Sequence, residues 1–364
     1  MSYQMRTKGR KAAALLVLCL VAGLLLAGCG QPSPSPGTQG KTEALKVVEL
    51  KLAHFWPSSH WIETEVVPAW VAAVEKATNG QVKVTSYPGE TLLKAAAIYD
   101  GVVQGVADIG MSCYGYTAGR FPVMEALMIP GITYNSAKVA SKVAWETAKQ
   151  LNPKELQDTK HLMVFATGPG ALMMKAPVRT LQDLKGVEVG VTAGPRVKAL
   201  ELLGATPVAM PMSEMYEAQS RGVIKGCLGP VEVLKGFRLG EVTNYVTETP
   251  FLYNQVFFMV MNQAKWNSLS PEVQNAITEV TDKLYEEKVA GLWDAINESG
   301  MKWVQEKKPV EVLTLSAEEQ KVWLGRLQTM LDEYTATLNS KGLPGQEIMK
   351  TIQDLAAKYN AEYK

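Results

Sequence analysis

Hydrophobic and polar positions alternate along most of the chain in two ways. Short runs that alternate or are rich in valine, bounded by Gly, Pro or Asn, predict β-strands. They cover residues 47–54, 81–87, 107–113, 161–166, 187–191, 206–210 and 255–261. Helix-length segments lie between them; in residues 60–78 the apolar side chains share one face, and Asn79-Gly80 favours a helix end. This alternation predicts an α/β architecture with mostly parallel sheets.

The pattern changes after residue 261, where the chain becomes mainly helical. Ser270, followed by proline and glutamate, predicts the start of a helix, and a long helix then extends to about residue 303. Ser316 and Glu319 form a capping box ahead of an apolar stripe that continues to residue 334. A last helix is expected to begin near Pro344. These helices are predicted to lie across the α/β body.

The first 44 residues have the composition of an export signal and a tether. Four basic residues precede an apolar run over residues 12–26 and the sequence Leu26-Ala27-Gly28-Cys29, which resembles a bacterial lipobox. A membrane-spanning anchor is the alternative, but it needs about 20 apolar residues. We therefore expect a lipoprotein signal over 1–28, a lipid on Cys29, and a Pro/Ser/Gly-rich tether over 29–44.

Composition excludes several classes of function. The 37 basic and 36 acidic residues leave a net charge of +1, which makes nucleic acid an unlikely partner. Three histidines and four cysteines have no metal-ligand spacing, so neither a metal nor another cofactor is indicated. Beyond the signal, Cys113 and Cys227 are expected to be free thiols, with a disulfide as the alternative that export would permit. No nucleophile elbow, phosphate loop, zinc motif or dinucleotide loop supports an enzyme.

An ordered series of motifs resembles the substrate-binding proteins of TRAP (tripartite ATP-independent periplasmic) transporters. The series spans about residues 46–340, and its order is more specific than any single motif. It comprises YPGE at 87–90, YDGVVQGVADIG at 99–110, LKG at 184–186, LGATP at 203–207, MPMSEMY at 210–216, FMVMN at 258–262 and KWNSL at 265–269.

This resemblance implies a two-lobed periplasmic binding protein fold with crossing strands and a long hinge-spanning helix. Lobe I would cover residues 45–167, lobe II would cover 168–254, and residues 255–364 would return to lobe I and span both. Such folds hold a small organic solute between the lobes, close around it and deliver it to a small and a large membrane subunit. The protein would then be extracytoplasmic, in the periplasm or on the outer face of the cytoplasmic membrane.

The family's usual carboxylate-binding arginine is missing from this sequence. It stands in a strand after Leu-Lys-Gly, where this chain has Gly190; a second arginine aligns with Gly170, and a common asparagine aligns with Gly229. Three interpretations of the missing arginine stay open. Gly190 could leave room for a bulkier or less charged solute, another cation could replace the arginine, or the protein could be a paralogue with a different function. The candidate cations are Arg196, Arg238 and Lys175, each of which, taken singly, is more typical of a solvated surface charge.

Aromatic and sulfur-containing side chains follow the predicted strands and favour a larger, partly apolar solute. They are Phe55, Trp56, Tyr114, Tyr116, Met173 and Met212. Glu232 is placed where the second lobe should present a polar group for a hydroxyl, amide or cationic group, with a surface acid as the alternative. The predicted substrate-binding residues are Trp56, Tyr114, Tyr116, Gly170, Gly190, Met212 and Glu232.

Two rival functions would use the same cleft. A secreted lipoprotein enzyme would turn its solute over, whereas a binding protein would only be stabilised by it. A sensor lipoprotein would dock to a receptor ectodomain instead of a transporter.

Overall fold

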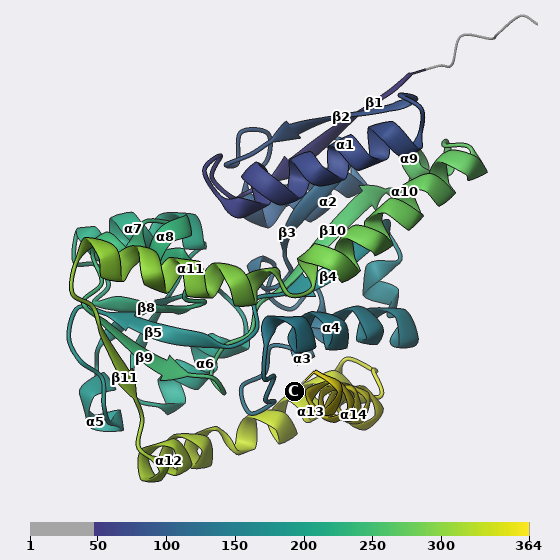
Figure 1. The fold of residues 1–364 in the computed structure, drawn as a ribbon. Helices are drawn as coiled ribbons and strands as arrows, with labels where there is room; N and C mark the ends of the chain where they lie inside the picture. The colour runs from purple at the N-terminus through teal and green to yellow at the C-terminus, as the bar shows by residue number, and fades with distance from the viewer. Residues whose placement is uncertain (1–46, 364) are drawn as a thin grey trace, which may run out of the picture. The chain divides into compact units, whose positions relative to one another are not determined.

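A computed structural model describes residues 47–363 of the chain (Figure 1). The predicted export signal, the lipidation site Cys29 and the whole of the tether lie outside the described residues. Within them, no helix is both long and apolar enough to cross a membrane. The same region contains no group of three or more His, Cys, Asp or Glu side chains that could hold a metal ion.

The described strands form two sheets. The first has the order β2-β1-β3-β10-β4. Its strands are β1 (Val48–His54), β2 (Val82–Tyr87), β3 (Ile109–Cys113), β4 (Thr159–Ala166) and β10 (Val256–Asn262). The second has the order β11-β9-β5-β8-β6-β7. Its strands are β5 (Gly170–Met174), β6 (Glu188–Val191), β7 (Thr206–Ala209), β8 (Gly226–Gly229), β9 (Tyr245–Thr249) and β11 (Glu311–Thr314).

Both sheets are mixed, and five of the nine pairings between the described strands are parallel, a smaller share than the expected mostly parallel sheets. β1 pairs in parallel with β2 and β3, and β6 pairs in parallel with β7 and β8. β10 runs antiparallel to its neighbours β3 and β4, and β5 runs antiparallel to β8 and β9. The antiparallel strands are those that enter or leave a sheet directly from the other one, which needs no intervening helix.

Helices connect and cover these sheets. They are α1 (Val67–Ala77), α2 (Ile98–Val103), α3 (Pro122–Ala126), α4 (Ala137–Leu151), α5 (Leu181–Leu184), α6 (Pro195–Leu202), α7 (Met212–Ser220), α8 (Val233–Gly236), α9 (Gln263–Asn267), α10 (Pro271–Leu284), α11 (Leu292–Lys307), α12 (Ala317–Leu327), α13 (Thr329–Ser340) and α14 (Gly345–Glu362). The helical C-terminal region is confirmed. The predicted long helix is α10 and α11 joined by a π-helical turn over Tyr285–Val289.

Local sequence signals explain where several helices begin. The Ser270 Oγ accepts a hydrogen bond from the Val273 N–H at the start of α10, and the Ser316 Oγ accepts one from the Glu319 N–H at the start of α12. The stripe expected to continue from α12 to residue 334 is instead divided between α12 and α13 at Gln328.

The chain passes between the sheets at residues 167–169 and 250–255, and these crossings are bonded to each other. The Thr167 N–H donates to the Gln255 carbonyl oxygen at 3.0 Å, and the Gln255 N–H donates to the Thr167 Oγ1 at 3.2 Å. Gly168 has φ +67°, and a Cβ there would lie 2.6 Å from the Ala137 backbone nitrogen, so only glycine fits this crossing. The two crossings therefore form a short, tightly packed ribbon.

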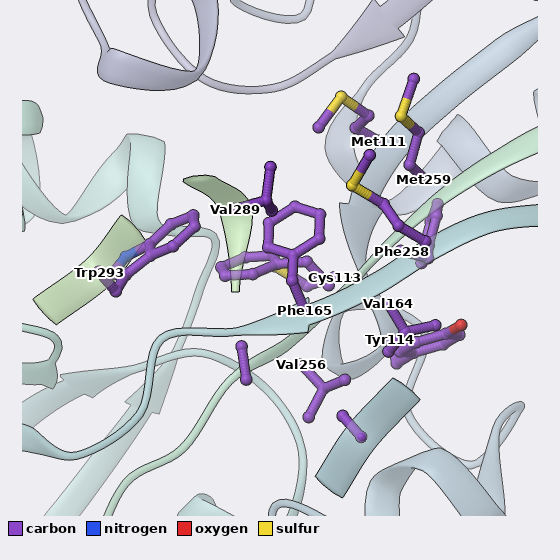
Figure 2. Packing of buried hydrophobic residues seen from close by; sticks show 14 of the residues in the cluster. Met111, Cys113, Tyr114, Val164, Phe165, Val256, Phe258, Met259, Val289 and Trp293 are labelled. Atoms are coloured by element: carbon purple, nitrogen blue, oxygen red, sulfur yellow. The ribbon is translucent and has the colours of Figure 1, made fainter. Parts of the chain in front are cut away.

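Aromatic packing ties α11 to the first sheet. The Trp293 ring lies 5.0 Å from that of Phe257 and 5.7 Å from that of Phe165, and Figure 2 shows Phe165 and Trp293 within the buried cluster. Helix α11 also contacts α8 and α4. Cys113 and Cys227 are buried and unbonded, so the expectation of free thiols is confirmed.

Candidate functional site

A narrow cavity lies where strands of both sheets end. Its empty volume is about 270 Å³, but the centre of a water molecule can reach only about 20 Å³ of it. Small-molecule sites usually enclose about 300–1,000 Å³, so the cavity is closed in this structure and its walls must move apart to admit a solute. The lining residues lie at the ends of β1, β3, β4, β6, β7 and β8 or around the start of β10: Phe55, Trp56, Cys113, Tyr116, Thr167, Thr192, Met212, Pro230, Glu232, Val233, Phe237, Tyr253, Gln255 and Phe257.

Four of the residues expected to bind solute meet at this cavity. Trp56 follows β1, Tyr116 follows β3, Met212 opens α7 and Glu232 follows β8. The Tyr116 hydroxyl lies 3.4 Å from the Met212 backbone nitrogen, which links the two sides of the space. Carboxyl ends of parallel strands are where ligands usually bind in α/β folds.

Tyr114 lies elsewhere, although it is only two residues from Tyr116. Residues Tyr114–Tyr116 form a 3₁₀ turn, in which positions two apart are about 240° apart around the axis. The Tyr114 ring packs 5.0 Å from Phe121 and 5.1 Å from Phe258, and its hydroxyl lies 3.0 Å from the His161 Nε2. Tyr114 is therefore part of the core of the first sheet.

Gly170 and Gly190 are also absent from the lining of this cavity. A Cβ on Gly170 would lie 2.7 Å from the Gly229 carbonyl oxygen, and a Cβ on Gly190 would lie 2.5 Å from the Ile224 Cδ1. At Gly170 the contact is with the backbone, which leaves no room for an arginine, whereas at Gly190 the end of the flexible Ile224 side chain would have to move. The close packing of β5 against β8 therefore explains the glycine at position 170.

Six of the fourteen residues that line the cavity are aromatic. The rings of Phe55 and Trp56 stack with centroids 4.2 Å apart, and Tyr116 meets Phe55 edge-on at 5.2 Å. The ring of Phe257 lies 5.2 Å from that of Trp56. These rings form an apolar wall and pack on one another in the stacked and edge-on arrangements that aromatic pairs favour.

Arg196, at the start of α6, lies fully buried behind one end of the cavity. Its Nη1 donates to the Asn254 carbonyl oxygen at 2.8 Å. Its Nη2 donates to the Thr192 Oγ1 at 2.8 Å, the Ala193 carbonyl oxygen at 2.9 Å and the Gln255 Oε1 at 2.5 Å. Every one of these acceptors is neutral. Burial lowers the pKa of the Arg196 guanidinium from its usual value, but an arginine remains charged in a protein.

The buried guanidinium fixes the polarity of two residues in the cavity wall. The Thr192 Oγ1 and the Gln255 Oε1 both accept hydrogen bonds from Arg196. Thr192 can therefore offer its O–H to a solute as a donor, and Gln255 can offer an amide N–H. The Thr192 hydroxyl can also donate to the Gln255 Oε1 at 3.3 Å, and one Gln255 amide N–H donates to the Val256 carbonyl oxygen at 3.4 Å. This end of the cavity is therefore rich in donors and lies near the positive charge of Arg196, the chemistry that binds a carboxylate.

Arg196 was expected to be a solvated surface charge, and that interpretation is wrong. Its burial comes from residues 254 and 255, far away in the sequence, which no local pattern reveals. Of the other candidate cations, Arg238 is 66% exposed and pairs with Glu241 at 2.9 Å. Lys175 is half-buried and does not line this cavity.

Glu232 is buried, which excludes the surface-acid interpretation. Only 3% of its side chain is exposed, and its Oε2 lies 3.2 Å from the Nε2 of His60, which is also fully buried. The His60 Nδ1 accepts a hydrogen bond from the Ile62 N–H. A neutral His60 therefore carries its proton on Nε2 and donates to Glu232.

Sequence reasoning missed several lining residues, including Thr167, Thr192, Tyr253 and Gln255. Thr167 and Thr192 directly follow predicted strands, so the rule that found Trp56 could also have found them. Gln255 begins a predicted strand and gave no comparable signal.

Comparison with known proteins identifies the family. The profile of the bacterial extracellular solute-binding proteins, family 7, matches residues 52–337. The chain belongs to this family. The resemblance to TRAP substrate-binding proteins and the expected fold are thereby confirmed. Members of family 7 are extracytoplasmic solute-binding proteins.

Curated relatives match this chain over part of their own length. The 2,3-diketo-L-gulonate-binding periplasmic protein YiaO of Escherichia coli (strain K12) is 28% identical over 63% of this chain and 72% of its own length. Two other curated relatives are matched over 62% and 63% of their own length.

Two solved structures of TRAP solute-binding proteins are similar over most of this chain. One is a marine metagenome TRAP solute-binding protein specific for aromatic acid ligands, in complex with 3-hydroxybenzoate; it is 31% identical, with a TM-score of 0.81 over 86% of this chain and 99% of its own. The other, from Rhodoferax ferrireducens T118 with copurified benzoate, is 27% identical, with a TM-score of 0.81 over 87% of this chain and 100% of its own.

Proposed function

We propose that this protein captures a small aromatic carboxylic acid in the cavity and delivers it to the membrane subunits of a TRAP transporter. The observation that carries this proposal is the buried Arg196, which turns Thr192 and Gln255 into donors at one end of an aromatic slot. The aromatic acids in two similar solved structures support the same solute class. The solute is bound and released unchanged.

The aromatic walls favour this class over sugar acids and dicarboxylates. A sugar acid needs many polar partners around its hydroxyl groups, whereas the rings of Phe55, Trp56 and Phe257 present apolar faces. A second carboxylate would need another cation, and Arg196 is buried behind one end only.

A panel of solutes tests the proposal. The soluble body is titrated with benzoate, 3-hydroxybenzoate, D-glucuronate and succinate while its melting temperature is followed, and the hits are measured by calorimetry. A bound acid should stabilise the fold by RT ln(1 + [L]/Kd), about 2.7 kcal/mol at a hundredfold excess over Kd. A clear preference for D-glucuronate or succinate would contradict the proposal, and consumption of any solute would favour the enzyme alternative.

Closure of two lobes, 45–167 and 168–254 with the shared segment 255–364, is part of the same proposal. Tight binding should make the body more compact in small-angle scattering. An unchanged scattering profile with a saturating, tightly bound acid would argue against hinge closure.

The membrane attachment is proposed from the sequence alone. Leu26-Ala27-Gly28-Cys29 predicts a mature chain that begins at a lipidated Cys29. Mass spectrometry of the N-terminal peptide from host membranes should find the lipid, and an unmodified thiol would refute this part of the proposal.

A further inference from the structure

The Glu232 carboxylate reaches the cavity from the segment after β8, and its position is fixed from several sides. The Glu232 N–H donates to the Asn297 Oδ1 of α11 at 2.9 Å, and the His60 Nε2 lies 3.2 Å from its Oε2. A Cβ on Gly236 would lie 2.4 Å from the same Oε2, and a Cβ on Gly300 would lie 2.9 Å from the Glu232 Cα. The carboxylate is therefore held in place before any solute arrives.

The Oε1 of Glu232 is the oxygen left for a solute. It makes no hydrogen bond within the described residues, whereas Oε2 is engaged by His60. A desolvated carboxylate oxygen without a donor is costly, and a C–H of an unsubstituted ring does not relieve that cost. A solute hydroxyl does relieve it by donating to Oε1. A second solute carboxylate would be repelled.

We infer that Glu232, positioned by His60, makes the site selective for aromatic acids that carry a hydroxyl group on the ring and excludes aromatic dicarboxylates. This inference rests on the proposed function. It adds a second polar contact to the same solute, between the solute hydroxyl and Glu232. The carboxylate of the solute lies toward Thr192 and Gln255, and its hydroxyl lies toward Glu232. Glu232 acts by contact with the solute, whereas His60 is a positioning residue.

Solute analogues test the inference in the unaltered protein. Calorimetry is carried out with benzoate, with 3- and 4-hydroxybenzoate, with the two matching methoxybenzoates and with benzene-1,3- and benzene-1,4-dicarboxylate. At least one hydroxybenzoate should bind about tenfold more tightly than benzoate, since a hydrogen bond to a charged group has about that effect. Its methoxy analogue, which has no donor, should lose the gain, and both dicarboxylates should bind more weakly than benzoate.

Variants separate the role of Glu232 from a general effect on the fold. In Glu232→Gln, the hydroxybenzoate advantage should fall to within about threefold of benzoate, while dicarboxylate affinity rises. Merely structural damage would weaken all of these acids together. The matched control is Glu63→Gln, which alters the carboxylate 2.9 Å from His54, outside the cavity lining, and should leave the selectivity unchanged.

The positioning role of His60 has its own test. His60→Gln keeps a donor for Glu232 and should preserve most of the hydroxyl preference, whereas His60→Leu should lose it at a similar benzoate affinity. Equal binding of benzoate and both hydroxybenzoates by the unaltered protein, or an unchanged preference in Glu232→Gln, would overturn the inference while leaving the proposed function intact. Failure of every aromatic acid to bind would overturn both.

Discussion

Replacing Arg196 by methionine tests the charge that we assign to the carboxylate end of the solute. The side chain makes four hydrogen bonds to neutral acceptors, each contributing about 1.5–3 kcal/mol when the donor is charged. Burial of the guanidinium costs several kcal/mol, which offsets much of that gain. Methionine removes the charge and leaves the acceptors unpaired, so we expect a loss of about 3–5 kcal/mol in the free energy of unfolding.

The effect on binding should be separate and selective. Loss of a buried charge partner costs about 2–5 kcal/mol, which corresponds to an affinity for benzoate that is about 30-fold to a few thousandfold weaker. Benzamide has the same ring but no charge, so Arg196→Met should weaken benzoate far more than benzamide. Calorimetry measures both affinities, and thermal unfolding monitored by circular dichroism confirms that the variant is folded at the assay temperature.

A matched variant provides the control. Arg238→Met removes an exposed arginine that pairs with Glu241, and it should leave benzoate affinity unchanged. If folded Arg196→Met bound benzoate within threefold of the unaltered protein, the carboxylate would not be held at this end. Loss of affinity in Arg238→Met instead would move the substitute cation to the surface position.

Three further predictions follow from packing and burial. Gly190→Arg should lower the free energy of unfolding by about 1–3 kcal/mol or more through overpacking against Ile224, which thermal unfolding measures. Calorimetry should find that the variant binds no dicarboxylate. A stable variant that binds a dicarboxylate would contradict this prediction. Burial raises the pKa of Glu155 to about 7, so the folded protein loses stability as pH rises from about 4.5 to 7. Glu155→Gln should therefore raise the melting temperature at pH 8 and lose this advantage near pH 4.5. A difference in melting temperature that does not depend on pH would refute the argument. Burial also raises the pKa of Cys113 well above its usual value and that of Cys227 to about 12, so both thiols should react with an aromatic disulfide reagent far more slowly in the native than in the unfolded protein.

Elements with a strong local signal could be predicted from the sequence. Ser270 and Ser316 mark helix starts because a cap needs only residues three positions away. The strands β5, β8, β9 and β11 were not predicted. β5 and β8 are short and contain glycine, and their pairing depends on partners 50 or more residues away. Such strands are defined by the sheet more than by their own residues.

The candidate site was predictable where position after a strand was sufficient, as for Trp56 and Met212. Tyr114 shows the limit of that rule, because a single 3₁₀ turn after β3 separates it from Tyr116. Arg196 shows a second limit. It lies between proline and charged residues that are typical of a surface helix, and only the return of residues 254 and 255 buries it.

The ribbon that joins the sheets also belongs to the cavity wall, because Thr167 and Gln255 line the cavity and bond each other. The two crossings between the sheets therefore also contribute residues to the cavity wall. A substitution at Gln255 should alter both the movement of the lobes and the choice of solute. Met212 and Phe237 line the same cavity outside these two crossings. We expect that specificity for a new solute evolves most readily at such positions, because the cavity wall can change shape there while the two crossings stay unchanged.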